Sequence, residues 1–379
     1  MRYANRYRLE TIGSTQEASD PVGSSATTPS NGGEMGKKSE ASAIKPRLLD
    51  IAEVSGVSTA TVSRVLNGKP GVGEEVRNSV LAALDMLGYE RPAILRHKTA
   101  GLIGIVVPEL NNPIFPAFAQ GLEFRLAQHG YTPLICTQSP GGTTEDEAIE
   151  LLLGQGVSGI IFVSGLHADS TAATERYQNL RARGIPLAFI NGWAEGVDGT
   201  FVATDDAAGM DNAVRHLASL GHTRIALLIG PDRLVPAQRK IASFRTALLE
   251  HVGEADAEPH IFHTLYTLEG GHAAAERMVE SGHTALICGS DLMALGAIRG
   301  IRGKGLRVPE DVSVIGYDDS PLIAFVEPPL TTVHQPVGAL CQAVVTAVLG
   351  EIDGNPGPRT ELLFRPELIV RASTTAAPR

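Results

Sequence analysis

Residues 48–68 read LLDIAEVSGVSTATVSRVLNG, two short helical patterns separated by a glycine. In both halves, small and apolar side chains recur with the spacing of one helix face. Gly56 suits the sharp turn between the helices, and Ser58 is a favourable N-cap for the second. The pattern therefore predicts a helix-turn-helix.

The second helix is expected to bury Val62, Val65 and Leu66. Its outward side chains are then Thr59, Ala60, Ser63 and Arg64. A third helix follows, and its apolar stripe consists of Val76, Val80, Leu84 and Leu87. Three helices around one small core can hold a DNA-reading helix rigid. Geometry alone does not establish that role, because two short helices and a turn occur in many unrelated proteins.

The stretch DIAEVSGVSTATVSRVLNG at 50–68, with GYERP at 88–92, resembles the headpiece of the lac repressor/galactose repressor family of bacterial transcription regulators. The resemblance implies double-stranded operator DNA as a partner. The DNA-contacting positions that it implies are Thr59, Ala60, Thr61, Ser63, Arg64, Asn67 and Leu95. Arg64 also suits a bidentate bond to guanine in the major groove. Leu95 stands where the family wedges a leucine into the minor groove.

Two departures from the family pattern stand out. Arg47 and Gly73 lie where relatives often place a Ser or Thr cap, so helix entry is capped less strongly. The linker, residues 91–99, is about three residues shorter than usual by comparison with the family's hinge helix. It is expected to form an abbreviated hinge helix that carries Leu95, or else only a flexible connection.

The region from residue 100 onward alternates strand-like runs with amphipathic helical patterns. The runs are LIGIVV, PLIC, GIIFV, PLAFI, RIALLIG, ALICG and DVSVIGY. Such alternation predicts parallel sheets with helices on both faces, and a stretch this long is expected to form two Rossmann-like lobes. The resemblance implies a periplasmic-binding-protein-like pair of lobes with a ligand cleft between them.

The resemblance also implies which residues meet a small ligand, expected to be a sugar or sugar derivative. They are Ile114, Phe115, Asn191, Lys240, Tyr266, Asp291 and Gln335. Ile114 and Phe115 follow the first strand of this region, where ligands of such sheets bind. Asp291 begins a helix, so an N-cap role is the competing interpretation. Lys240 replaces the family's usual arginine and offers a point charge instead of a bidentate fork.

Composition predicts a cytoplasmic protein. No apolar run reaches the length of a membrane span, and no signal-peptide pattern precedes the headpiece. The three cysteines, Cys136, Cys288 and Cys341, lack metal-ligand spacing and are expected to be ordinary buried thiols in a reducing compartment. We therefore expect no metal, no cofactor and no membrane partner.

Charge is unevenly distributed. Residues 45–99 carry eight Lys or Arg and six Asp or Glu, a net of +2, whereas residues 100–379 carry 19 and 31, a net of −12. The small domain therefore suits a polyanion better than the large one does. Because +2 is modest, affinity for DNA is expected to depend on a second subunit.

The expected domains are a disordered extension at 1–45, the headpiece at 46–90, the linker at 91–99, the two-lobed effector-binding and dimerisation domain at 100–372 and a tail at 373–379. The extension is poor in apolar residues and rich in Ser, Thr and Gly, which favours disorder. Met35 opens a short basic segment and is our candidate for the natural start.

These observations together predict a homodimeric DNA-binding repressor that recognises a palindromic operator and responds to a carbohydrate effector. Two alternatives remain open: a sugar receptor without a DNA role, and a regulator whose cleft serves a protein partner. An enzyme is not expected, because the chain has no G-x-S-x-G elbow, P-loop or H-E-x-x-H motif.

Overall fold

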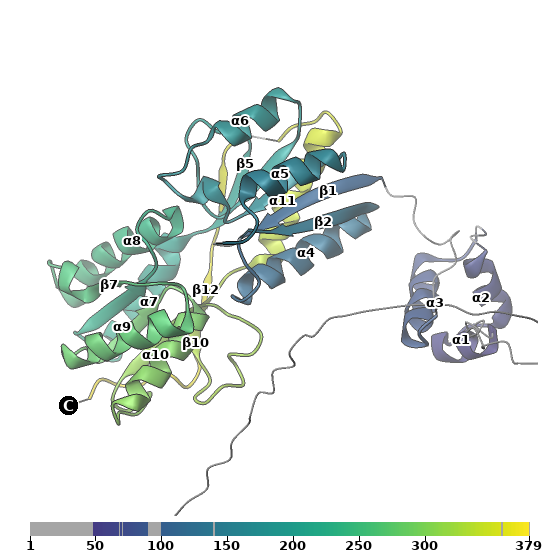
Figure 1. Cartoon of the computed structure of the whole chain (residues 1–379). Coiled ribbons are helices and arrows are strands. Elements are labelled where there is room, and N and C mark those ends of the chain that lie inside the picture. Colours follow the sequence, from purple (N-terminus) through teal and green to yellow (C-terminus); the bar gives the residue numbers. More distant parts are fainter. Residues whose placement is uncertain are drawn as a thin grey trace, which may run out of the picture. The chain divides into compact units, whose positions relative to one another are not determined.

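The computed structural model describes residues 48–67, 69, 71–89, 100–138, 141–357 and 359–378. The chain divides into two compact units, residues 1–96 and 97–379 (Figure 1). The predictions for the extension at 1–45, for Met35 and Arg47, and for the linker with Leu95 lie outside the described residues.

The first unit contains three helices, α1 (Leu48–Ser55), α2 (Thr59–Leu66) and α3 (Glu74–Met86). The Ser58 side chain caps α2 by accepting a hydrogen bond of 3.2 Å from the Thr61 amide. Gly73 caps α3 without a side-chain bond. The buried core consists of Ile51, Val62, Val65, Val80, Leu81, Ala83 and Leu84. The predicted helix-turn-helix and third helix are therefore confirmed.

The second unit consists of two lobes, each built on a six-stranded sheet. The N-terminal sheet has the order β11-β5-β4-β3-β1-β2 and is entirely parallel. Its strands are β1 (Gly101–Val107), β2 (Tyr131–Thr137), β3 (Gly159–Val163), β4 (Leu187–Ile190), β5 (Thr200–Thr204) and β11 (Glu361–Phe364). Its helices are α4 (Ile114–Gln128), α5 (Glu145–Gly154), α6 (Glu175–Ala182) and α11 (Val337–Ile352).

The C-terminal sheet repeats this arrangement as β12-β10-β9-β8-β6-β7, with only β12 antiparallel. Its strands are β6 (Ile225–Ile229), β7 (Ile261–His263), β8 (Ala285–Cys288), β9 (Ser313–Asp318), β10 (Thr331–His334) and β12 (Glu367–Ile369). Its helices are α7 (Asp206–Ser219), α8 (Val235–Val252), α9 (Leu268–Glu280) and α10 (Asp291–Gly303). In both lobes the strand order reverses beside the first strand, which creates a crevice for ligands.

Helices cover both faces of each sheet. One core of the N-terminal lobe lies under α4 and α11 and another under α5 and α6. The C-terminal lobe has matching cores under α7 with α8 and under α9 with α10. All seven predicted strands are present, and the α/β two-lobed prediction is confirmed.

The chain crosses between the lobes three times, from β5 to α7, from β10 to α11 and from β11 to β12. Figure 1 shows the consequence for α11, which lies against the N-terminal lobe although it follows β10. Hydrogen bonds connect the crossings: Thr204 donates to Gln335 at 2.7 Å, and the Asp205 amide donates to Phe364 O at 2.8 Å. These three segments form the pivot between the lobes.

The described end of the chain packs on the C-terminal lobe. Ser373 is fully buried and donates to Val314 O, and the Ala377 amide donates to Leu220 O. The three cysteines are free thiols, Cys288 and Cys341 buried and Cys136 half-buried. No described helix is long and apolar enough to cross a membrane.

Candidate functional site

The outer face of α2 is the first candidate site. Thr59, Ala60, Arg64 and Asn67 are exposed, whereas Val62 and Val65 are buried. The half-buried pair, Thr61 and Ser63, flanks that face. The structure thus gathers six of the seven predicted DNA-contacting residues on one helix and its C-cap.

Two of these polar side chains, Thr61 and Asn67, also stabilise the ends of α2. The Thr61 hydroxyl lies 2.9 Å from the Ser58 hydroxyl. At the other end, the Asn67 amide nitrogen donates to Ser63 O at 2.8 Å. Arg64 is the one basic residue of α2.

A cavity of about 260 Å³ between the lobes is the second candidate site. Eight residues from each lobe line it, at the carboxyl ends of the two sheets where ligands of such folds bind. The N-terminal lobe supplies Pro108, Glu109, Asn112, Ile114, Phe115, Ser164, Ala168 and Asn191. The C-terminal lobe supplies Leu234, Pro236, Lys240, Tyr266, Gly289, Ser290, Asp318 and Gln335.

Six of the seven predicted ligand residues line this cavity, and Asp291 does not. Both Asp291 carboxylate oxygens accept hydrogen bonds inside the lobe, from Ser320 at 2.7 and 2.8 Å and from Thr332 at 2.6 Å. Its N-cap interpretation is also wrong, because Ser290 caps α10 by accepting from the Met293 amide. Ser290 therefore replaces Asp291 in the candidate site.

A buried ion pair supports the C-terminal side of the cavity. Lys240 Nζ lies 2.6 Å from Asp206 Oδ1 and 4.0 Å from the centre of the Tyr317 ring. The Tyr317 hydroxyl donates to the same Asp206 oxygen at 2.8 Å. The charge of Lys240 is therefore neutralised within the protein, and a ligand does not meet an unpaired cation there.

Asp318 is a cavity residue that the sequence prediction missed. Gln335 donates to Asp318 Oδ1 at 2.7 Å, whereas Oδ2 is buried without a partner. Burial raises the pKa of Asp318 well above its usual range, and the nearby Asp291 carboxylate raises it further. Its backbone φ of 118° is rare for a residue other than glycine, and such backbone strain often marks a binding site. The sequence signal was its place at the end of a buried strand.

Two cavity residues of the N-terminal lobe share an uncommon backbone conformation. Ser164 and Asn191 follow β3 and β4 with φ values of 46° and 61°, and Asn191 Nδ2 donates to Ser164 Oγ at 3.1 Å. Behind them, His167 Nε2 lies 2.8 Å from Asn191 O and 3.2 Å from Ile190 O. Burial lowers the pKa of His167 to about 4, so a neutral imidazole donates to these carbonyls. Sequence reasoning did not identify His167.

Tyr266 packs against glycines that end two strands. A Cβ on Gly230 would lie 2.0 Å from Tyr266 Cε2, and one on Gly289 would lie 2.9 Å from Cε1. Glycine is therefore required on both strands for the ring to reach the cavity.

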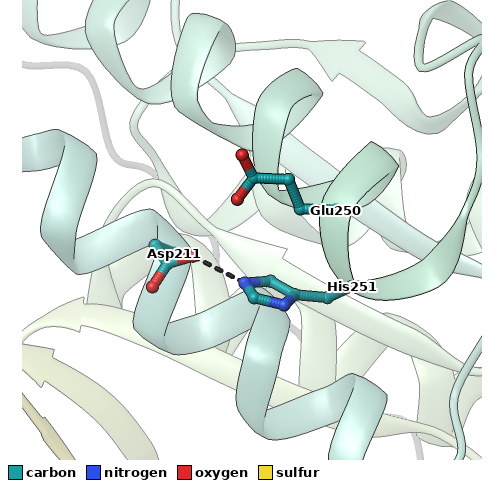
Figure 2. Close-up of side chains that lie close together, drawn as sticks. All are labelled: Asp211, Glu250 and His251. Carbon is teal, nitrogen blue, oxygen red and sulfur yellow. Dashed lines mark hydrogen bonds and ion pairs between the residues drawn. The ribbon is translucent and has the colours of Figure 1, made fainter.

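Asp211, Glu250 and His251 form a cluster of possible metal ligands that does not line the cavity (Figure 2). His251 Nε2 lies 2.6 Å from Asp211 Oδ1. The other Asp211 oxygen faces Arg215 at 3.3 Å, and Glu250 is exposed. The contacts are those of an ion-pair network that connects α7 with α8.

Comparison with known proteins identifies the family. The model for bacterial regulatory proteins of the lacI family matches residues 47–92, and that for a periplasmic binding protein-like domain matches 214–374. The HTH-type transcriptional regulator reg1 of Streptomyces lividans is 57% identical over 336 residues, 88% of this chain and 97% of that protein. MalR of Streptomyces coelicolor is 56% identical over 335 residues, again 88% and 97%. The chain belongs to the lacI family.

Three solved structures of lacI-family regulators resemble this one with a TM-score of 0.64. The CelR–cellobiose complex is 30% identical and covers 87% of this chain and 100% of CelR. A regulator from Enterococcus faecium with bound ribose is 28% identical, covering 73% and 100%. The lac repressor dimer bound to operator and the anti-inducer ONPF is 29% identical, covering 87% and 99%.

This lacI-family member is a DNA-binding transcriptional regulator and not an enzyme. The prediction of a regulator is confirmed, and the alternative of a receptor without a DNA role is not favoured. The individual contacts with DNA and ligand remain predictions.

Proposed function

We propose that this regulator is a repressor whose affinity for operator DNA changes when a small neutral carbohydrate binds between its lobes. The observation that carries the proposal is the cavity itself, which joins the carboxyl ends of both sheets and is lined by polar and aromatic side chains of both lobes. The related structures with cellobiose and ribose support this ligand class.

The cavity lining suits a molecule with hydroxyl groups and an apolar face. Asn191 and Ser290 offer polar side chains to ligand hydroxyl groups, and so does Gln335, which donates a hydrogen bond of 2.7 Å to Asp318. Phe115 and Tyr266 supply aromatic surface. Because Asp206 neutralises Lys240, the cavity favours a neutral ligand over an anionic one. The proposed ligand residues are Ile114, Phe115, Asn191, Lys240, Tyr266, Ser290, Asp318 and Gln335.

We propose that two copies of the chain act together on a palindromic operator. One headpiece contacts too few base pairs for specificity, and a two-fold protein matches a two-fold site. The second unit exposes large apolar side chains in the loop before α4, where Leu110 is 55% exposed, and in the loop after β9, where Leu322 is 74% and Phe325 86% exposed. Surface of this kind marks a candidate dimer contact.

The proposed DNA contacts are those of the outer face of α2. Arg64 reads a base in the major groove, while Thr59 and Ala60 contribute shape and methyl contacts. Thr61, Ser63 and Asn67 bind phosphates and set the register, and Leu95 enters the minor groove. A repressor with this target acts in the bacterial cytoplasm, where operator DNA lies.

Ligand binding changes DNA affinity only if the ligand prefers one arrangement of the lobes over the other. Coupling of about 1–3 kcal/mol, or about 5- to 150-fold in affinity, is typical of such regulators. Gln335, which lies in one pivot segment and accepts a hydrogen bond from Thr204 in another, lines the cavity, so a change in lobe angle can follow directly from binding.

The test begins with selection of DNA sites from a random pool by the full-length protein. The selected site is then titrated with and without neutral mono- and disaccharides that include cellobiose and ribose. We expect a palindromic site and at least a fivefold change in Kd with one saccharide. A palindromic site that no neutral saccharide affects would overturn the effector proposal.

Matched variants separate the two sites. Arg64→Ala should abolish selection of the site, whereas Arg77→Ala, which removes the same charge from α3, should not. Asp318→Asn should remove the saccharide effect and keep DNA affinity, whereas Asp353→Asn, an exposed carboxylate on α11's C-cap, should change neither. Equal effects of the paired variants would contradict the residue assignments.

A further inference from the structure

The loop that follows β3 reaches across the cavity to the C-terminal lobe. The Ser170 amide and hydroxyl both donate to Arg233 O at 2.8 Å. Asp169 and Leu234 form an isolated antiparallel β-bridge. The lobes are therefore connected by backbone hydrogen bonds in addition to the three chain crossings.

Side chains reinforce this connection. The Arg233 guanidinium forms an ion pair with Asp169 Oδ2, and Gln238 Nε2 donates to Ser170 Oγ at 3.0 Å. The Asp169 side chain is only 8% exposed, although Arg233 is half exposed. The contact thus combines one largely buried carboxylate with donors from the opposite lobe.

Hydrogen bonds within its own loop hold the Asp169 carboxylate in place, independently of Arg233. Its Oδ1 accepts from the Thr171 amide at 3.0 Å and from the Thr171 hydroxyl at 2.7 Å. Burial acts to raise the pKa of Asp169, but the bonds from Thr171 and the charge of Arg233 outweigh it, so the pKa lies below its usual value. The loop therefore presents an ionised carboxylate to the other lobe.

The connection also forms part of the cavity wall. Ala168, which precedes Asp169, and Leu234, the bridge partner of Asp169, both line the cavity. Unlike the covalent crossings, these contacts must break whenever the lobes rotate apart about the pivot. Separation would at the same time uncover the cavity beside them.

We propose that Asp169, Ser170 and Arg233 form a non-covalent strap that holds the lobes closed over the cavity and whose opening admits the ligand. The strap sets the fraction of closed molecules in the absence of ligand, and apparent ligand affinity depends on the fraction of the binding-competent state. The role in ligand entry rests on the proposed effector function, whereas the strap as a connection between lobes does not.

Hydrogen exchange tests the strap without any ligand. Arg233→Ala removes the guanidinium but keeps the carbonyl that accepts from the Ser170 amide, so exchange of that amide reports opening itself. We expect exchange in a peptide spanning 168–172 to accelerate at least threefold. Arg359→Ala is the matched control, because Arg359 is as exposed as Arg233 and forms an ion pair with Asp198 inside one lobe. Unchanged exchange in Arg233→Ala, or equal acceleration in Arg359→Ala, would overturn the proposal.

A disulfide gives a second, independent measurement. Residues 169 and 234 are antiparallel bridge partners, whose Cα separation suits a disulfide. Asp169→Cys with Leu234→Cys, in a Cys136→Ser background, should oxidise nearly completely without ligand, since the other cysteines are buried. The disulfide replaces the Asp169–Arg233 ion pair, while the bonds from Ser170 to Arg233 O remain. A folded double variant that stays reduced under oxidant would therefore refute the close approach of the lobes that the strap requires.

The oxidised double variant also tests regulation. With the lobes locked, cellobiose and ribose should change DNA affinity less in the oxidised than in the reduced double variant, because these two forms differ only in the disulfide. If neither sugar affects the wild type, the effector proposal fails for these sugars, while hydrogen exchange and cross-linking still decide the strap.

Discussion

Replacing Lys240 by methionine should destabilise the C-terminal lobe strongly. The substitution removes the ammonium that lies 2.6 Å from Asp206, and both side chains are 7% exposed. Methionine keeps most of the volume beside the Tyr317 ring, so the change isolates the charge. Of the two hydrogen bonds that the structure describes for the Asp206 carboxylate, the variant keeps the one from the Tyr317 hydroxyl.

The magnitude follows from the geometry. Two unit charges 2.6 Å apart attract by about 6 kcal/mol at an effective dielectric constant of about 20, and the desolvation of both groups offsets part of this. Loss of one partner of a buried pair typically costs about 3–5 kcal/mol, because the other charge remains buried without compensation. We expect a loss near the lower value, since Tyr317 still donates to Asp206.

Urea unfolding followed by far-ultraviolet circular dichroism measures the loss across both lobes. Fluorescence of Trp193, the chain's one tryptophan, reports the N-terminal lobe alone and should change less. The double variant Lys240→Met with Asp206→Asn should recover at least half of the lost stability, because it removes the stranded charge. Lys304→Met, which breaks a surface pair with Glu280, should leave unfolding almost unchanged.

Two results would refute this reasoning. A loss below about 1 kcal/mol in Lys240→Met would place the pair in the class of weak surface ion pairs. A double variant no more stable than the single one would show that lost packing, and not the uncompensated carboxylate, causes the effect.

Three further predictions concern other parts of the chain. Ser58→Ala should lower the free energy of unfolding of the headpiece by about 1 kcal/mol, measured by calorimetry, because it removes the cap on the Thr61 amide. An unchanged melting curve would contradict this. Burial lowers the pKa of His167 to about 4, so this side chain binds fewer protons in the folded than in the unfolded state. The free energy of unfolding should therefore fall by about 3 kcal/mol as the pH falls from about 6.5 to 4. His167→Gln should flatten that part of a stability–pH profile, and an identical profile would exclude the assignment. Gly296→Ala should lower the free energy of unfolding in urea by about 3 kcal/mol, because the new Cβ would lie 1.9 Å from Leu268 O. Gly303→Ala, at a position on α10 with open space around it, should not lower it.

Periodic patterns predicted the elements that carry them. The helix-turn-helix could be predicted because α1 and α2 are amphipathic, Ser58 is an N-cap residue and Gly56 adopts a φ of 69° at the turn. Six of the seven predicted strands are apolar runs that are largely buried on both faces, whereas β2, at a sheet edge, is only partly buried. Two of the missed strands, β7 with three residues and β11 with exposed leucines, have patterns too weak to distinguish from loops. Another, β5, is fully buried inside its sheet, but its TFVAT sequence begins and ends with threonine and gives only a short apolar run.

Site prediction depended on alignment to family positions, and it failed by one residue where adjacent side chains point to opposite sides. Ser290 lines the cavity, whereas the neighbouring Asp291 is turned inward by Ser320 and Thr332. Asp318 was passed over because a carboxylate with one unpartnered oxygen cannot be distinguished from a solvated one without knowledge of its surroundings.

Local periodicity and capping, which act over a few residues, therefore specify the headpiece and the two sheets from the amino-acid order alone. The cavity, the neutralised Lys240 and the strap arise from contacts between residues as far apart as Asp169 and Arg233. Those contacts depend on how three chain crossings set one lobe against the other, and no local pattern records that geometry.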